Sequence, residues 1–122
     1  MRRYNDYMSL KKNRIKIEIN RFYMVYAGSP HPAFVYEIDK KHKTFKSIKF
    51  GTTKAKHMTE IHSLQTTSLK QFVHNRPFEG VRSDYGDKEL VGLSINKLDY
   101  PIIEEIKKRE PNKSKRAKLR YK

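Results

Sequence analysis

The sequence predicts a mostly β domain with a C-terminal helix, of the α+β class, built as a small antiparallel barrel or open sheet with basic ends. Short β-prone runs separated by polar turns indicate the strands. A change to helical spacing after Asn96 indicates the helix. A length of 122 residues, with 36% hydrophobic and 34% charged residues, allows one domain with a modest core.

The first part of the chain predicts an arm followed by a strand. Residues 1–14 are polar and basic, and we expect a basic N-terminal arm there. Apolar residues alternate with polar ones from Ile15 and then run on through residues 22–26, which is typical of a strand with a buried end. Two prolines flank His31 in the segment that follows, so this strand ends in a loop.

The clearest hairpin joins residues 33–38 to residues 44–50 through a polar turn at residues 39–43. Strict alternation does not place Phe45 on the same face as Ile48 and Phe50. We therefore expect a β-bulge near Ser47 that brings these apolar side chains together.

The second half of the chain predicts shorter elements. Residues 61–64, 68–73 and 90–95 are β-prone, and a closing helix starts at Asn96 and ends before Pro111. We expect one domain over residues 15–108 and a disordered basic tail over residues 109–122. The predicted core contains Phe34, Val35, Ile38, Ile48, Phe50, Leu90, Leu93 and Ile95.

Charge points to a polyanionic partner. The net charge is +15, of which +5 lies in residues 1–21 and +6 in residues 104–122. Such ends attract nucleic acid with a strong salt dependence, although solvated tails that keep the protein soluble would have the same composition. The chain has no cysteine, which excludes disulfides, thiolate zinc sites and cysteine nucleophiles. No run is long and apolar enough to span a bilayer, so we expect a cytoplasmic protein without a membrane partner.

The order of these segments resembles the MazF/PemK-like group of toxins over roughly residues 22–108. The resemblance rests on the Gly28-Ser29-Pro30-His31-Pro32 loop, the hairpin that ends at Gly51-Thr52-Thr53, and the run of residues 90–95 before a closing helix. It implies an SH3-like barrel and metal-free cleavage of single-stranded RNA. It also implies a homodimer and an acidic antitoxin that covers the basic groove.

The resemblance implies catalytic roles for His31 and for Thr52 or Thr53. The group usually has arginine at the first position, whereas imidazole is partly neutral near pH 7. Metal-free cleavage needs one group to accept the 2′-hydroxyl proton, one to protonate the leaving oxygen, and positive charge over the phosphorane. Arg76 and Arg82 are the candidates for that charge, and His74 is a second candidate acid or base.

Each of these residues also has a plain structural interpretation. Phe78 can stack on a base or fill the end of the barrel, and Arg76 can hold a phosphate or pair with Asp84 or Asp87. His57 and His62 have no zincin spacing, and we expect neither a metal nor another cofactor. The candidate nucleic-acid-binding residues are Lys54, Lys56, His74, Arg82, Lys113, Lys115, Arg116, Lys118 and Arg120.

Two functional hypotheses follow, with RNA the favoured ligand. The first is a toxin-like, metal-independent endoribonuclease. The second is a non-catalytic module that binds RNA, DNA or a ribonucleoprotein through its basic ends, of the kind a mobile element directs against a host nucleoprotein. A basic structural subunit of a larger assembly is a third interpretation.

Overall fold

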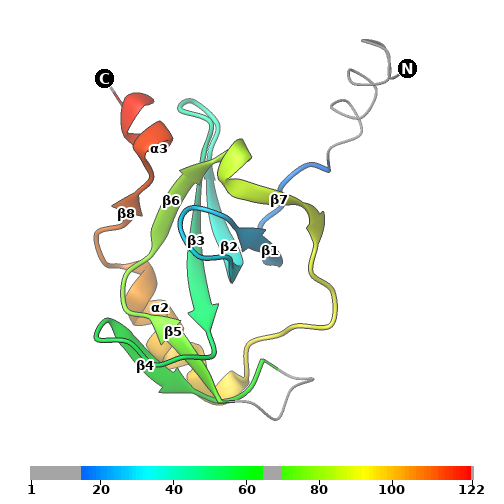
Figure 1. The fold of residues 1–122 in the computed structure, drawn as a ribbon, viewed down its shortest axis with the longest axis vertical. Coiled ribbons are helices and arrows are strands. Elements are labelled where there is room, and N and C mark those ends of the chain that lie inside the picture. The colour runs from blue at the N-terminus through cyan, green and yellow to red at the C-terminus, as the bar shows by residue number, and fades with distance from the viewer. Residues whose placement is uncertain (1–14, 65–69, 122) are drawn as a thin grey trace.

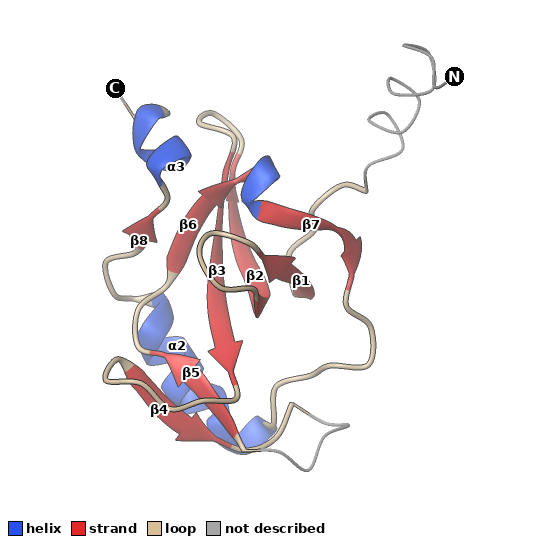
Figure 2. Ribbon diagram, in the orientation of Figure 1, coloured by secondary structure: helices blue, strands red, loops and turns tan. Residues whose placement is uncertain are grey.

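A computed structural model describes residues 15–64 and 70–121 of the chain. The described part is mostly β, with one largely antiparallel sheet and a short helix towards the C-terminus, as the sequence predicts (Figures 1 and 2). The predicted N-terminal arm, residues 1–14, lies outside the described residues. No helix in the described ranges has both the length and the apolarity needed to cross a membrane.

The centre of the sheet is a meander of three strands with a fourth on its outer side. Strand β2 pairs antiparallel with β1 and β3, and β1 also pairs with β7. The predicted hairpin is thereby confirmed. The bounds are β1 (Arg21–Val25), β2 (His31–Asp39), β3 (Thr44–Gly51) and β7 (Tyr85–Glu89).

The sheet branches at β3. The first half of β3 pairs with β6 (Phe78–Val81), from Thr44 to Ser47. Its last two residues pair instead with β5 (Gln71–His74), which in turn pairs with β4 (Met58–Ile61). The chain that leaves β5 for β6 therefore passes the middle of β3, where Lys49 lies. On this edge the middle of β3 has no partner strand, whereas on the other edge it pairs with β2.

The two faces of the sheet carry separate hydrophobic cores. One core packs under helix α2 (Tyr100–Lys107), and the other lies against the inner face of β1, β2 and β7. The first contains Phe22, Ile48, Phe50, Ile61, Leu64, Val73, Ile103 and Ile106. The second contains Ile17, Tyr23, Val25, Ala33, Val35, Phe78 and Tyr85.

The expected bulge near Ser47 in the second hairpin strand is wrong. Strand β3 alternates regularly, and the register shift lies in β2, between Val35 and Glu37. Phe45 does not join Ile48 and Phe50 but packs on the other face, with its ring centroid 5.7 Å from that of Tyr85. The side chains of β3 can alternate strictly because each face of the sheet carries a hydrophobic core that accepts apolar residues.

The predicted strand at residues 90–95 is also wrong, because that segment is a loop. The preceding, more polar residues form β7, held by the pairing of β1 and by the buried Tyr85, whose hydroxyl lies 2.9 Å from Ser47 Oγ. Tertiary contacts thus outweigh β propensity here. The three apolar residues of the loop that were predicted as core are partly buried against the α2 core: Leu90, Leu93 and Ile95.

The predicted helix is present. A 3-10 turn (Lys97–Asp99) precedes α2, and the Asn96 side chain accepts a hydrogen bond from the backbone N–H of Leu98. Asp99, 2% exposed, accepts from the backbone N–H of His62 and lies 2.9 Å from its ring Nδ1. These contacts tie the end of β4 to the start of the helix.

The expectation of a disordered basic tail is corrected. Strand β8 (Asn112–Lys113) pairs parallel with β6, and a short helix α3 (Lys115–Leu119) follows it. Ser114 caps α3, and Ala117 is fully buried. We call residues 112–121 the C-terminal strap. Its five Lys and Arg side chains leave the backbone and the small residues free to pack, so net charge alone did not indicate disorder.

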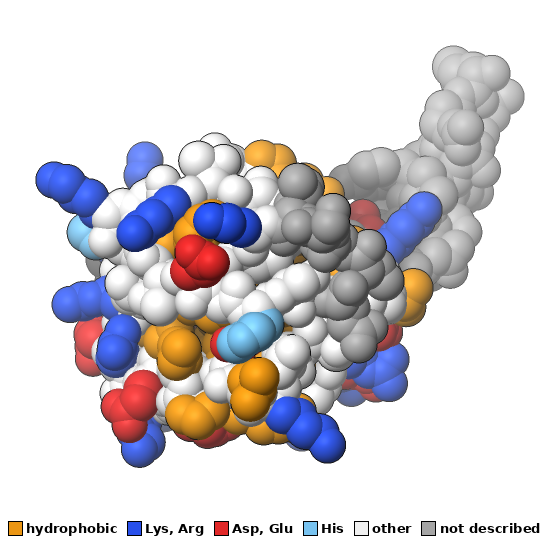
Figure 3. All heavy atoms as spheres, turned by 90° about the horizontal axis from the view of Figure 1, so that it is seen from below, with side chains coloured by type: hydrophobic (Ala, Val, Ile, Leu, Met, Phe, Trp, Pro, Cys, Tyr) orange, Lys and Arg blue, Asp and Glu red, His pale blue; other side chains and the backbone are white. Residues whose placement is uncertain are grey.

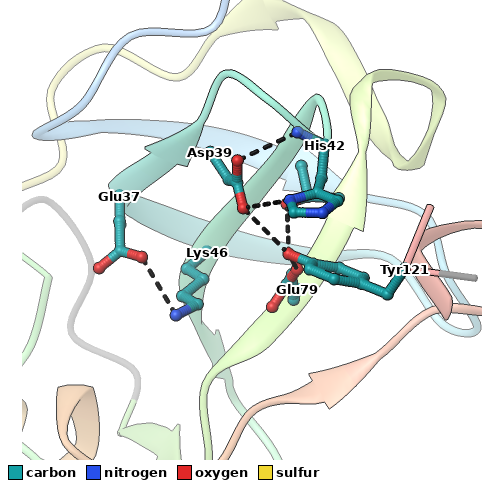
Figure 4. Close-up of polar contacts among 7 residues, drawn as sticks. Glu37, Asp39, His42, Lys46, Glu79 and Tyr121 are labelled. Atoms are coloured by element: carbon teal, nitrogen blue, oxygen red, sulfur yellow. Dashed lines mark hydrogen bonds and ion pairs between the residues drawn. The ribbon is translucent and has the colours of Figure 1, made fainter.

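The last described residue of the strap, Tyr121, is held by a polar cluster at the turn between β2 and β3 (Figure 4). Its hydroxyl donates to the carboxylate of Glu79, which is 1% exposed, and lies 3.3 Å from Asp39 Oδ2 and 3.1 Å from Thr44 Oγ1. The His42 ring stacks on the tyrosine, with centroids 4.2 Å apart. The cluster therefore fastens the strap to the sheet.

The substitution Tyr121→Phe tests this fastening. It leaves a buried carboxylate without its phenol donor, so we expect the free energy of unfolding to fall by about 1 to 3 kcal/mol in chemical denaturation. The matched control is Tyr26→Phe, because Tyr26 is 55% exposed. Equal stability of Tyr121→Phe and the wild type would contradict the assignment.

Candidate nucleic-acid interface

The branch point of the sheet contains a pocket of about 430 Å³. It lies beside Lys49 in the middle of β3, and the connection from β5 to β6 forms much of its wall. Among the described residues that line it there is no carboxylate. The lining residues are Lys49, His57, His74, Asn75, Arg76, Pro77, Phe78 and Asn112.

Besides the two histidines of the pocket lining, a further histidine, His31, lies against the ring of His74. The register of β2 on β3, with Ala33 opposite Lys49, continues to place His31 opposite Gly51. A Cβ atom on Gly51 would lie 3.5 Å from His31 Nδ1 and 3.2 Å from Met58 Cε. A side chain at this position would therefore press on Met58 and lie in ordinary contact with the imidazole.

His31 and His74 are in direct contact. Their ring centroids are 5.2 Å apart in an edge-on arrangement, although the residues are 43 positions apart in the chain. The sequence-predicted residues His31, His74 and Arg76 thus gather at one end of the sheet, as they must if they act on one phosphate.

Burial and the mutual repulsion of these groups keep the imidazoles neutral. Burial, followed in order by the charges of Lys49, His31 and His57, lowers the pKa of His74 to about 4. Burial followed by the charge of Lys49 also lowers the pKa of His31, while a hydrogen bond with the backbone of Phe50 acts in the opposite direction. Burial lowers the pKa of Lys49 itself.

Two further features leave this group of bases ready for a ligand. His74 Nε2 is buried and has no hydrogen-bond partner within the described structure. Lys49 Nζ lies 4.9 Å from the centroid of the Phe78 ring, and the described residues give it no carboxylate partner. A buried polar atom without a partner is costly, and an incoming anion would remove that cost.

The wall formed by residues 74–77 is held in place from both sides. The Asn75 backbone N–H donates to the His57 carbonyl, and Thr59 Oγ1 donates to Asn75 Oδ1 at 2.6 Å. Arg109, beyond α2, donates to the Asn75 carbonyl at 2.8 Å. These bonds leave the Arg76 side chain exposed at the edge of the pocket, paired with neither Asp84 nor Asp87.

Two roles were predicted for Phe78, stacking on a base and filling the interior, and the structure places its side chain in the interior. It is 5% exposed, and its ring meets Tyr85 edge-on in the inner core. The alternative of an open stacking platform for a base is not what the structure shows, because too little of the ring reaches solvent.

The threonines are less closely placed than the histidines. Thr52 and Thr53 follow Gly51 in an exposed bend, and within the described chain their hydroxyls make no hydrogen bond. Lys54 and Lys56 are exposed in the same loop, which continues to His57 in the pocket wall. The loop therefore places cations beside the pocket rather than inside it.

The remaining predicted cations lie on the strap, except Arg82, which lies in the turn before β7. Lys113 lies 4.2 Å from the ring centroid of Tyr121, and Arg116 donates to Ser83. The exposed cations of the strap are Lys115, Arg116, Lys118 and Arg120. Strap and pocket meet at Asn112, which lines the pocket and donates its backbone N–H to the Pro77 carbonyl.

Arg82 serves the fold. Its guanidinium donates to the carbonyls of Tyr85, Gly86 and Ile15 and lies 3.5 Å from Asp87. These contacts hold the entry to β1 against β7, away from the pocket lining.

At the end of the molecule that carries α2 and the β4–β5 hairpin, the described residues in view form no continuous basic surface. Lysine and arginine side chains are scattered around its rim, with hydrophobic side chains and a histidine nearer its middle (Figure 3). The pocket at the branch of the sheet is therefore the better candidate for a nucleic-acid interface.

Sequence reasoning missed Lys49 and His57 as members of this group. Lys49 stands between apolar residues of a strand, where it is expected to point to solvent. The only available signal was the spacing of His31 and Lys49 from the hairpin turn, which brings both to the same end of the sheet.

Comparisons of this chain with protein-family models, with curated proteins and with solved structures found no match.

The pKa of His74 is directly measurable. We expect its ring proton resonance to titrate near pH 4 in NMR spectra of the folded protein, because burial and Lys49 disfavour the imidazolium. The pKa of an unfolded histidine is about 6.5. The contribution of neutral His74 to the free energy of unfolding is therefore complete above pH 6.5, and it is lost as the pH falls towards 4 and the unfolded chain takes up a proton. A midpoint near 6.5 in the folded protein would contradict the burial of this ring.

Arg82→Ala separates fold from function. Because the guanidinium holds backbone carbonyls, we expect the substitution to lower the midpoint of thermal unfolding while leaving RNA affinity within about twofold of wild type at temperatures where both are folded. A variant of normal stability with a much weaker affinity would show that Arg82 contacts nucleic acid instead.

Proposed function

We propose that this chain binds single-stranded RNA at the branch of the sheet and cleaves it without a metal ion. The observation that carries the proposal is the contact of two largely neutral histidines, His31 and His74, beside Lys49 in a pocket whose described lining has no carboxylate. Transfer within an RNA strand requires a base, an acid and positive charge, and two imidazoles beside a fixed cation can fill these roles once one ring gains a proton.

The roles follow from the environments of the two rings. His74, with the lower pKa of about 4, is the base that accepts the 2′-hydroxyl proton. The 2′-oxygen then attacks phosphorus, and the bond from phosphorus to the 5′-oxygen breaks. His31, whose protonated form the Phe50 backbone supports, donates a proton to that leaving oxygen. The products are a 2′,3′-cyclic phosphate and a 5′-hydroxyl.

Positive charge completes the proposed site. Lys49, close behind the histidines, balances the charge that develops on the phosphorane, and Arg76 at the pocket edge holds a neighbouring phosphate. Lys54, Lys56 and the exposed cations of the strap extend the path of the strand. The roles predicted for Thr52 and Thr53 remain part of the proposal, as hydroxyls at the pocket entrance.

The likeness to MazF/PemK-like toxins belongs to this proposal. Support comes from the strand order β7-β1-β2-β3-β6, in which a single 3-10 turn (Arg82–Asp84) joins the two outermost strands. A five-stranded meander joined in this way has the connectivity that closure into an SH3-like barrel needs. An acidic antitoxin over the cationic pocket, and a homodimer, are the partners that this likeness suggests.

A non-catalytic binding module for RNA, DNA or a ribonucleoprotein is the second candidate. It is favoured by the absence of hydrogen bonds between the threonine hydroxyls and the histidines in the described structure, and by the cations that line the strap outside the pocket. On that proposal the strap, rather than the histidines, determines affinity.

The test is incubation of the purified protein with labelled single-stranded RNA in EDTA. We expect cleavage, and we expect His31→Ala and His74→Ala each to lower its rate by about 10²- to 10⁴-fold, because a proton-transfer group is lost. Lys49→Met should lower it by about 10²-fold through lost charge stabilisation. Lys41→Met, in the distant hairpin turn, is the matched control and should cleave as the wild type does.

Intact RNA at every salt concentration would contradict the enzyme. If binding then persists and depends on the strap cations, the non-catalytic module is the better account.

A further inference from the structure

Three groups that can carry a proton converge at the branch of the sheet from three different elements. His31 comes from β2, Lys49 from β3 and His74 from β5, and the two imidazole rings touch. His57 reaches the same pocket from the β3–β4 loop, and Arg76 reaches it from the β5–β6 connection. No carboxylate of the described chain faces this group across the pocket.

We propose that the pocket binds an RNA phosphodiester together with one proton, which the pair His31 and His74 holds between them. The inference rests on the proposed function and adds its regulation, namely that acidification strengthens binding at this site.

The reason is electrostatic. In the empty pocket a proton on either ring would place a second positive charge beside Lys49 in partly buried surroundings, which is why the pKa values of both histidines are lowered. A phosphodiester brings one negative charge among them. The protonated ring then becomes favourable because it gains an opposite charge. Its contact with water was already reduced by burial in the free protein, so binding costs it little further hydration.

The geometry gives the anion a place to bind. His74 Nε2 is buried without a partner, so an incoming phosphate oxygen can accept a hydrogen bond there at no cost in lost contacts. Gly51 places no side chain beside the His31 ring. The loop that carries Asn75 is fixed by bonds to His57 and Arg109, so this wall of the pocket is already held in place before a ligand binds.

The bound proton is also the one that cleavage transfers to the leaving oxygen. If the substrate loads a proton onto the pair, one ring is an acid and the other a base at the moment of reaction. The base takes the 2′-hydroxyl proton and the acid gives its proton to the 5′-oxygen, so the pair still holds one proton when the products form. The two histidines can therefore be neutral in the free protein and still supply one acid in the complex with RNA.

The experiment measures binding without cleavage. A 2′-O-methyl oligouridylate has no 2′-hydroxyl to react, and neither its phosphodiesters nor its bases titrate between pH 4 and 8. Calorimetry at pH 5.5 and 7.5, in buffers of different ionisation enthalpy, reports the number of protons taken up. We expect uptake approaching one proton per occupied site at pH 5.5, and affinity that rises by up to about tenfold for each pH unit lost in that range.

Two variants locate the proton. His74→Gln keeps a hydrogen-bonding side chain but cannot titrate, and we expect it to lose most of the uptake and most of the pH dependence. The matched control is His42→Gln, which removes a histidine from the Tyr121 cluster and should leave both unchanged. Circular dichroism at each pH confirms that the variants are folded.

The possible failures separate cleanly. Binding with no proton uptake, or uptake that persists in His74→Gln, overturns this inference; metal-free cleavage of unmodified RNA by the same preparation would still support the proposed function. An oligonucleotide that binds only through the strap, together with uncleaved RNA, overturns both.

Discussion

The change of partner along β3 is the constraint on which the rest of the structure depends. A strand that paired with one neighbour throughout would have its middle residues covered by the ladder. Here β6 is bonded as far as Ser47 and β5 from Phe50, so the pair Ile48 and Lys49 has a partner strand on one side only. The apolar side chain of Ile48 fills one core, and Lys49 is left at the mouth of a pocket.

Charge is segregated along this same strand. Near Thr44 the carboxylates of Asp39 and Glu79 are satisfied by the strap tyrosine and by His42, while near Gly51 the imidazoles and Lys49 have no carboxylate among the described residues. A protein with a net charge of +15 has more cations than its carboxylates can compensate. The uncompensated end is where an anionic ligand gains most.

The parts of the fold set by local pattern were predictable. The hairpin between residues 33 and 50 and the helix after Asn96 follow from alternation and from a capping side chain. The parts set by distant contacts were not. Strand β7 is polar and exists because β1 pairs with it, and the strap is ordered because Ala117 and Tyr121 find partners on β6 and the hairpin turn.

The site divides in the same way. His31 was named from the resemblance to a toxin group, and His74 and Arg76 from their chemistry, and the fold brings the three together. Lys49 was hidden because a lysine in an alternating strand is ordinarily solvated, and only the branching of the sheet, which no local pattern encodes, makes it part of a pocket. Arg82 had the right charge but its guanidinium instead donates to backbone carbonyls at the start of β7 and before β1.

The most direct test of the account is a crystal structure of the protein with a short 2′-fluoro RNA bound. The account predicts a phosphate within hydrogen-bonding distance of His74 Nε2 and close to Lys49, with the chain running past Arg76. An RNA that lies along the strap alone, with the two histidines still in contact and no phosphate beside them, would contradict it.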